Sequence, residues 1–151
     1  MSNWIWTLFV LGTVLCWGAY GPTLQKGQAA LGSNAWKAIL CVGAAYFVLA
    51  VVIPVIILKV QQTPMNFPAD GTFFASLAGA LGAIGAMCIA GAFKTGGSHL
   101  IVMPLVFGCA PLMNIIVSSA LHPPEKAPSP YLYVGVVLLA AGAGMVLYFK
   151  P

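Results

Sequence analysis

The sequence predicts an all-α integral membrane protein, a bundle of five transmembrane helices, and two observations support this. Of its 151 residues, 61% are hydrophobic and only 5% are charged, whereas soluble domains carry roughly 25% charged residues. The hydrophobic residues also gather into five runs, each close to the roughly 20 residues that cross a hydrocarbon core as an α-helix. Lipid offers no partners to backbone amides, so segments of this kind are expected to be helical.

Each predicted span is bracketed by aromatic residues or lysine, which anchor helix ends at the membrane surface. The predicted spans are residues 4–24, 36–58, 72–93, 100–121 and 130–149. Short connections at residues 27–35, 60–71, 95–98 and 122–129 make consecutive helices antiparallel. No linker or shift in composition divides the chain, so a single domain of residues 1–151 is expected.

The end of the first span departs from a plain apolar helix, because it reads Trp-Gly-Ala-Tyr-Gly-Pro-Thr-Leu-Gln-Lys from Trp17 to Lys26. The Gly21-Pro22 pair predicts an interruption of the helix, and interrupted membrane helices often mark a binding site in transporters. Trp17, Tyr20 and Lys26 are then candidate substrate contacts, with Lys26 meeting an anionic group. The alternative is an interfacial helix end, with an aromatic belt and a lysine anchor.

The fourth span is the second one expected to be interrupted. Pro104 and Pro111 lie about two turns apart, and each removes a backbone donor, so they predict two kinks on the same side. Asn114 is an amide well inside this span, and it serves either a hydrogen bond between helices or a substrate contact. His99 and His122 bracket the span at opposite ends and are interpreted as interfacial residues.

Small residues recur in the third and fifth spans. Gly79, Gly82 and Gly85 occupy every third position of the third span, and Gly142 belongs to a similar group in the fifth. Such residues let helix backbones approach closely in lipid. They serve either packing within one chain or a seam between two copies, and the sequence leaves both alternatives open.

The net charge of +4 comes from six lysines set against Asp70 and Glu125. With five spans, the side that holds the amino terminus carries Lys59 and Lys126, and the other side carries Lys26, Lys37, Lys94 and Lys150. Lysine is enriched in cytoplasmic loops, so a cytoplasmic carboxyl terminus in a plasma or inner membrane is expected, with a mixed or dual orientation as the alternative. Because every charge lies beside an apolar run, the basic balance indicates lipid headgroups as partners and no nucleic acid.

The sequence lacks the residues that several kinds of chemistry require. No carboxylate lies inside a span to relay protons, and no Ser/His pair or HExxH motif supports an enzyme. The cysteines, Cys16, Cys41, Cys88 and Cys109, lie singly in different spans, so neither a metal site nor a disulfide framework is expected. No cofactor is expected. The amino terminus lacks a basic leader and a small-residue cleavage site, so we expect the first span to be retained.

Two stretches suggest a family: Met-Pro-Leu-Val-Phe-Gly-Cys-Ala-Pro-Leu-Met-Asn at residues 103–114, and Tyr-Val-Gly-Val-Val-Leu-Leu-Ala-Ala-Gly-Ala-Gly-Met-Val-Leu at residues 133–147. They resemble the end of an EamA-type repeat of the drug/metabolite transporter superfamily. Trp17-Gly18 and the glycine-rich third span are similar to its earlier part, so the resemblance covers nearly the whole chain. It implies a ten-helix transporter made of two inverted five-helix repeats that hold the substrate between them.

This chain supplies one such repeat, so the resemblance implies that two copies pair, as in the related four-helix small multidrug resistance proteins. Those relatives use a glutamate in the first helix, but residues 14–20 contain none, and proton-driven drug export is therefore not expected. The leading hypothesis is a homodimeric small-molecule (metabolite) transporter, with substrate between Trp17 and Tyr20 and the Pro104–Asn114 face. The alternatives are a non-transporting subunit or assembly partner of a larger complex, and a lipid-handling protein.

Overall fold

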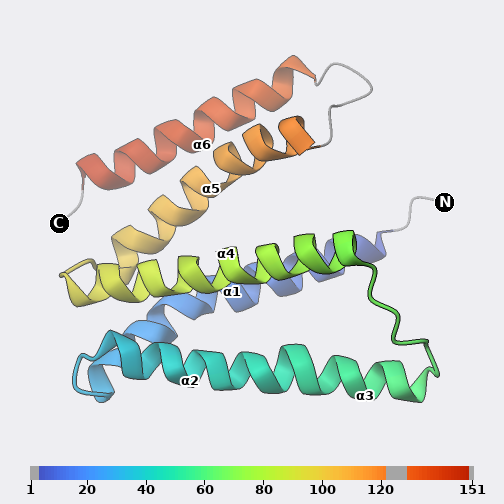
Figure 1. The fold of residues 1–151 in the computed structure, drawn as a ribbon. Coiled ribbons are helices and arrows are strands. Elements are labelled where there is room, and N and C mark those ends of the chain that lie inside the picture. The colour runs from blue at the N-terminus through green and yellow to red at the C-terminus, as the bar shows by residue number, and fades with distance from the viewer. Residues whose placement is uncertain (1–3, 122–128, 150–151) are drawn as a thin grey trace. The chain divides into compact units, whose positions relative to one another are not determined.

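In the computed structural model, which describes residues 4–121 and 129–149, every regular element is a helix (Figure 1). Five helices are long and apolar enough to cross a membrane: Ile5–Ala30, Ala35–Val60, Ala69–Lys94, His99–Leu121 and Pro130–Tyr148. The predicted all-α class and the five candidate spans are therefore confirmed. Most predicted ends agree to within a few residues, but the first helix continues well beyond residue 24.

The chain divides into two compact units, Met1–Gly96 and Gly97–Pro151, and each is described by itself. The first unit contains α1 (Ile5–Ala30), α2 (Ala35–Phe47), a π-helical turn η1 (Val48–Val52), α3 (Ile53–Val60) and α4 (Ala69–Lys94). The second contains α5 (His99–Leu121) and α6 (Pro130–Tyr148). The expectation of a single domain stays a prediction.

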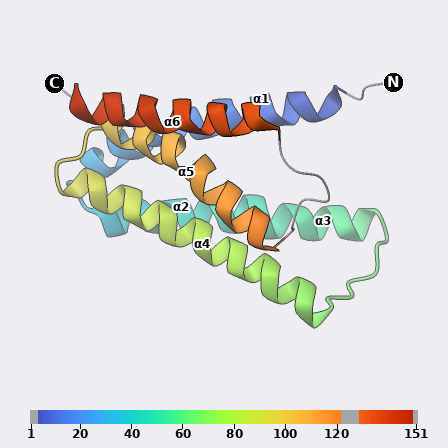
Figure 2. The same ribbon diagram turned by 90° about the horizontal axis from the view of Figure 1, so that it is seen from above.

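The core of the first unit lies at one end, where the carboxyl ends of α1 and α4 meet the start of α2. Its buried apolar residues are Leu24, Ala35, Ala38, Ala86, Ala90 and Phe93. Alanine predominates here, so the three backbones approach closely, as small residues allow in membrane proteins. Toward the other end, α4 diverges from the line of α2 and α3 (Figure 2), and among the described residues it packs on α1 and α2 but not on α3.

The interruption predicted at Gly21-Pro22 is wrong, because α1 is continuous from Ile5 to Ala30 with Pro22 inside it. The residue before a proline normally avoids helical geometry because its Cβ crowds the proline ring. Gly21 has no Cβ, so this clash is relieved and the helix loses one backbone hydrogen bond without ending. Residues 27–30, predicted as loop, are therefore helical, and the interfacial end lies beyond Lys26.

The connection from α1 to α2 is a short turn with two residues in the left-handed region, Gly32 (φ 75°) and Ser33 (φ 56°). Asn34 then starts α2, because its side-chain oxygen accepts hydrogen bonds from the backbone N–H groups of Trp36 (3.0 Å) and Lys37 (3.2 Å). An asparagine at this position satisfies amides that the helix itself leaves unpaired. This cap fixes where α2 begins beside the end of α1.

The second span contains a feature that the sequence analysis did not predict, the π-helical turn η1. It lies directly before Pro54, which has no N–H to bond the carbonyl of Ala50 and whose ring crowds that carbonyl. A wider turn relieves this contact, and the N–H of Ile53 bonds the carbonyl of Val48, five residues earlier. The span from Ala35 to Val60 thus remains helical through the proline.

The second unit is a helical hairpin in which α5 packs along α6. The two helices approach closely at Gly108, where an added Cβ would lie 2.9 Å from the Cβ of Ala143. Pro104 and Pro111 both lie inside α5, which is helical from His99 to Leu121, so the two prolines do not end this helix. The two predicted kinks stay a prediction. His122, Glu125, Lys126 and Lys150 fall outside the described residues.

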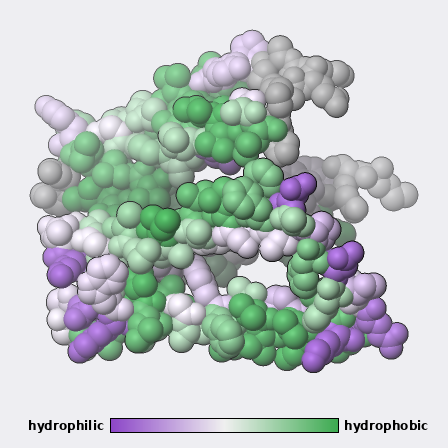
Figure 3. Space-filling view, viewed as in Figure 1, coloured by the Kyte–Doolittle hydropathy of each residue, from purple (hydrophilic) through white to green (hydrophobic). Residues whose placement is uncertain are grey.

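Charged residues of the first unit mark its two ends, with apolar surface between them (Figure 3). Lys26 and Lys37 lie on α1 and α2 near the turn that joins them, and Lys94 ends α4. Lys59 and Asp70 flank the connection from α3 to α4. This distribution is typical of a membrane-spanning unit. Which end faces the cytoplasm stays a prediction.

Candidate functional site

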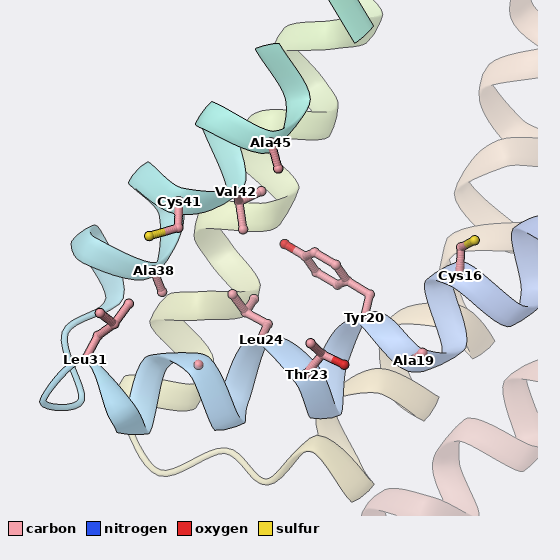
Figure 4. Close-up of a pocket in the computed structure, with 11 residues that line it drawn as sticks. Cys16, Ala19, Tyr20, Thr23, Leu24, Leu31, Ala38, Cys41, Val42 and Ala45 are labelled. Atoms are coloured by element: carbon pink, nitrogen blue, oxygen red, sulfur yellow. The ribbon is translucent and has the colours of Figure 1, made fainter. Parts of the chain in front are cut away.

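A cavity of about 410 Å³ lies between α1 and α2, within the first unit (Figure 4). Its lining comes from the second half of α1, the turn that follows, and the first half of α2. The lining residues are Cys16, Ala19, Tyr20, Thr23, Leu24, Gly27, Leu31, Ala38, Cys41, Val42 and Ala45.

The spacing of these residues explains why they share one cavity. On both helices they recur at intervals of three or four, so each set lies on one helix face. The small residues among them, such as Ala19, Gly27, Ala38 and Ala45, leave space that leucine would fill. The cavity is therefore a consequence of small side chains on two facing helices that a short turn joins.

Tyr20 supplies the most distinctive polar group of the cavity. Its ring projects from α1 toward α2, and the hydroxyl points to the part of α2 that carries Val42 and Ala45 (Figure 4). The hydroxyl oxygen is buried and has no hydrogen-bond partner among the described residues. Such a group can donate to or accept from a ligand, and leaving it unpaired costs free energy.

The rest of the lining is almost entirely apolar. Thr23 adds a second hydroxyl, and Cys16 and Cys41 add two thiols, while no charged side chain belongs to the lining. The cavity thus combines apolar walls with few hydrogen-bonding groups, which is the usual composition of a small-molecule site.

Gln28 is a buried polar residue that the sequence analysis missed. Its side chain is only 3% exposed, and its amide Nε2 donates to the backbone carbonyl of Ala90 at 3.2 Å, which ties α1 to α4. Its amide oxygen has no partner among the described residues. The spacing from Gly21 through Leu24 to Gln28, three and then four residues, places all three on one helix face and was a usable signal.

The structure brings one of the four predicted substrate contacts to the cavity. Tyr20 lines it, whereas Trp17 is 52% exposed and outside the lining. Lys26 is exposed on the last turns of α1 and also outside the lining, so its predicted role toward an anionic group is not supported here. Tyr20 differs from Trp17 because it lies on the face of α1 that meets α2.

Asn114 lies on α5 in the second unit, where it is exposed. Pro104 and Pro111 belong to the same helix. The expected cavity between this helix and the first span therefore stays a prediction.

The glycines singled out for packing face open space. An added Cβ at Gly79, Gly82, Gly85 or Gly142 would meet no atom of a described neighbour within 4 Å. Close packing within the chain occurs instead at Gly108, which the sequence analysis did not separate from other glycines. Of the two alternatives for these four residues, packing within the chain is not observed, and a seam between copies stays a prediction.

Among the described residues, no group of three or more His, Cys, Asp or Glu side chains is placed to hold a metal ion. Cys16 and Cys41 line the cavity, but Cys88 and Cys109 do not.

No protein-family model, no curated protein and no solved structure matches this chain. The resemblance to an EamA-type repeat therefore rests on the sequence motifs alone and stays a prediction.

Proposed function

We propose that the protein is a small-molecule transporter of the plasma or inner membrane, working as a homodimer of single EamA-like repeats. The observation that carries the proposal is the cavity beside Tyr20, set between two helices that are long and apolar enough to cross a membrane. Its volume of about 410 Å³ falls in the range of roughly 300–1,000 Å³ that is typical of ligand pockets.

The position of the cavity along α1 supports transport over simple packing. A helix that starts at Ile5 needs about 20 residues to cross the hydrocarbon core, which would place Cys16 near the middle of the membrane and Leu31 beyond its hydrocarbon core. The lining extends from Cys16 to Leu31. A cavity that reaches from the midplane toward one surface is the arrangement expected of one access state of an alternating-access transporter.

Pairing of two copies is supported by surface that remains uncovered in one chain. Gly79, Gly82 and Gly85 on α4 and Gly142 on α6 are exposed, with open space where a side chain would be. Rows of small residues favour close helix contacts in lipid. A second copy would supply the second half-site that the resemblance to two-repeat transporters calls for.

An accumulation assay tests the proposal. Proteoliposomes that contain the purified protein are incubated with a metabolite extract, washed and analysed by mass spectrometry beside protein-free liposomes. We expect at least one compound to accumulate only with protein. The Trp17→Ala and Asn114→Leu variants then test the predicted wider site, and unchanged uptake in both would restrict the site to the α1–α2 cavity.

The alternative of a non-transporting subunit is favoured by one observation, the exposure of all five long helices. At most 11% of the most apolar segment of any of them is buried, so lipid or partner chains must cover the rest. Native mass spectrometry after mild extraction separates the two functions. A stable complex with a different protein, without homodimer, would favour the subunit and contradict the transporter.

A further inference from the structure

We propose that the α1–α2 cavity binds a neutral, mostly apolar molecule that carries a hydrogen-bond acceptor, held by the Tyr20 hydroxyl. The inference rests on the proposed function in one respect, namely that the bound molecule is the transported substrate. Binding of the molecule can be tested without measuring transport. Three properties of the cavity carry it: the absence of charge from the lining, the unpaired hydroxyl, and the volume.

The lining argues against a charged ligand. It contains no lysine, arginine, histidine, aspartate or glutamate, and Lys26 and Lys37, on the neighbouring parts of α1 and α2, are exposed and outside it. An ion placed among these side chains would lose its hydration without gaining a counter-ion, which is strongly unfavourable in a membrane-embedded site. A neutral molecule avoids that cost.

The Tyr20 hydroxyl argues against a pure hydrocarbon. It is buried and unpaired among the described residues, so a ligand without polar atoms would leave it unsatisfied. A carbonyl or ether oxygen opposite this hydroxyl would accept its proton in a hydrogen bond, while the ring and the apolar lining cover the remainder of the ligand. The ring stays in place in Tyr20→Phe, so this variant isolates the hydroxyl.

The volume sets the size of the ligand. The space of about 410 Å³ lies at the lower end of the roughly 300–1,000 Å³ that is typical of sites for drug-sized ligands. The ligand is thus a small molecule, for example one with two aromatic rings joined by one polar group.

Benzophenone is a suitable probe because it is neutral, has one ketone oxygen and attaches covalently to nearby C–H bonds under ultraviolet light. The full-length protein in phospholipid nanodiscs is irradiated with benzophenone, the anion 4-benzoylbenzoate or a (4-benzoylbenzyl)trimethylammonium cation. The attachment sites are mapped by peptide mass spectrometry over a range of probe concentrations. We expect saturable labelling of residues 16–31 and 38–45 by benzophenone, above an unsaturable background on lipid-facing surfaces.

Tyr20→Phe is expected to raise the benzophenone concentration at half-saturation about three- to tenfold, the effect of one lost hydrogen bond. Tyr133→Phe, the same change on α6 outside the lining, is the matched control and should leave this concentration unchanged. Saturable labelling of the same residues by either charged probe at equal concentration would overturn the neutral class. Absence of saturable labelling with benzophenone, or an unchanged half-saturation in Tyr20→Phe, would overturn the site.

The two proposals fail separately. If benzophenone labels the cavity as expected but no compound accumulates in proteoliposomes, the ligand class stands and the transport function fails. If compounds accumulate but the saturable labelling is absent, transport stands and substrate binding at this cavity fails.

Discussion

At the scale of single residues, two buried polar groups distinguish the first unit from a plain apolar bundle. The Tyr20 hydroxyl faces the cavity, whereas the Gln28 amide links α1 to the carbonyl of Ala90 on α4. Both come from the end of the first span, where the sequence also has Gly21 and Pro22. Tyr20 was recognisable in the sequence as an aromatic residue with a polar tip. The opposite wall of the cavity, which includes Cys41 on α2, depends on how α2 packs against α1.

Gln28 offers a test of this interpretation. In Gln28→Glu the donor to Ala90 is replaced by a carboxylate oxygen, and a charge is buried without a partner. We expect the free energy of unfolding to fall by about 3 kcal/mol or more at neutral pH. The unfolding midpoint in an SDS titration, followed by circular dichroism, measures this effect.

Gln61→Glu is the control for charge alone, because Gln61 is exposed at the end of α3. It should cost less than about 1 kcal/mol, the size of an exposed helix-end charge effect. Equal losses in the two variants would show that Gln28 is not buried against α4.

At the scale of helices, much of the fold was predictable because each span must satisfy its own backbone in lipid. Apolar run length therefore located all five helices to within a few residues at most ends. The predicted interruption at Gly21-Pro22 was wrong because Pro22 remains inside α1, and Pro104 and Pro111 likewise do not end α5. The π-helical turn before Pro54 was not predicted. A proline costs one backbone bond, but whether the helix ends there depends on neighbours such as Gly21.

Contacts between helices were less predictable, because many glycines look alike in an apolar sequence. Gly79, Gly82 and Gly85 form the more regular pattern, yet the close approach occurs at Gly108. Which glycine meets a neighbour depends on how the helices cross, and local sequence does not determine that crossing.

The start of α2 depends on the Asn34 cap. Replacing it in Asn34→Ala removes the acceptor for the Trp36 and Lys37 amides, and the expected loss is about 1 kcal/mol of stability. Thermal unfolding in detergent measures it. Asn34→Asp retains an acceptor oxygen and should behave like the unmodified protein, so a similar loss in both variants would argue against the cap.

The crossing of α5 and α6 can be tested by exchanging two side chains. Gly108→Ala places a Cβ 2.9 Å from the Cβ of Ala143, and the helices must separate, at an expected cost of about 1–2 kcal/mol. Combining it with Ala143→Gly restores the space, and a double-mutant cycle in SDS unfolding measures the coupling.

Gly135→Ala, on α6, is the matched control, since an added Cβ there has no described neighbour within 4 Å. It should be neutral or slightly stabilising because alanine favours helices. Additive effects of the two exchanged positions would contradict the crossing at Gly108.

At the scale of the whole molecule, one chain leaves most of its apolar helix surface uncovered, and two copies of one repeat are proposed to pair. We expect native mass spectrometry from nanodiscs to show a homodimer. Substitution of leucine at Gly79 or Gly82 should weaken that dimer, because the added side chain would separate closely packed helices. A stable monomer would remove the second copy from the proposal.

The central claim is that the cavity beside Tyr20 holds the transported molecule. The most direct measurement is the initial rate of uptake into proteoliposomes, for a compound found to accumulate, by the unmodified protein, Tyr20→Phe and Tyr133→Phe. We predict that the concentration at half-maximal rate rises about three- to tenfold in Tyr20→Phe and is unchanged in Tyr133→Phe. Equal uptake kinetics in all three proteins would contradict the claim.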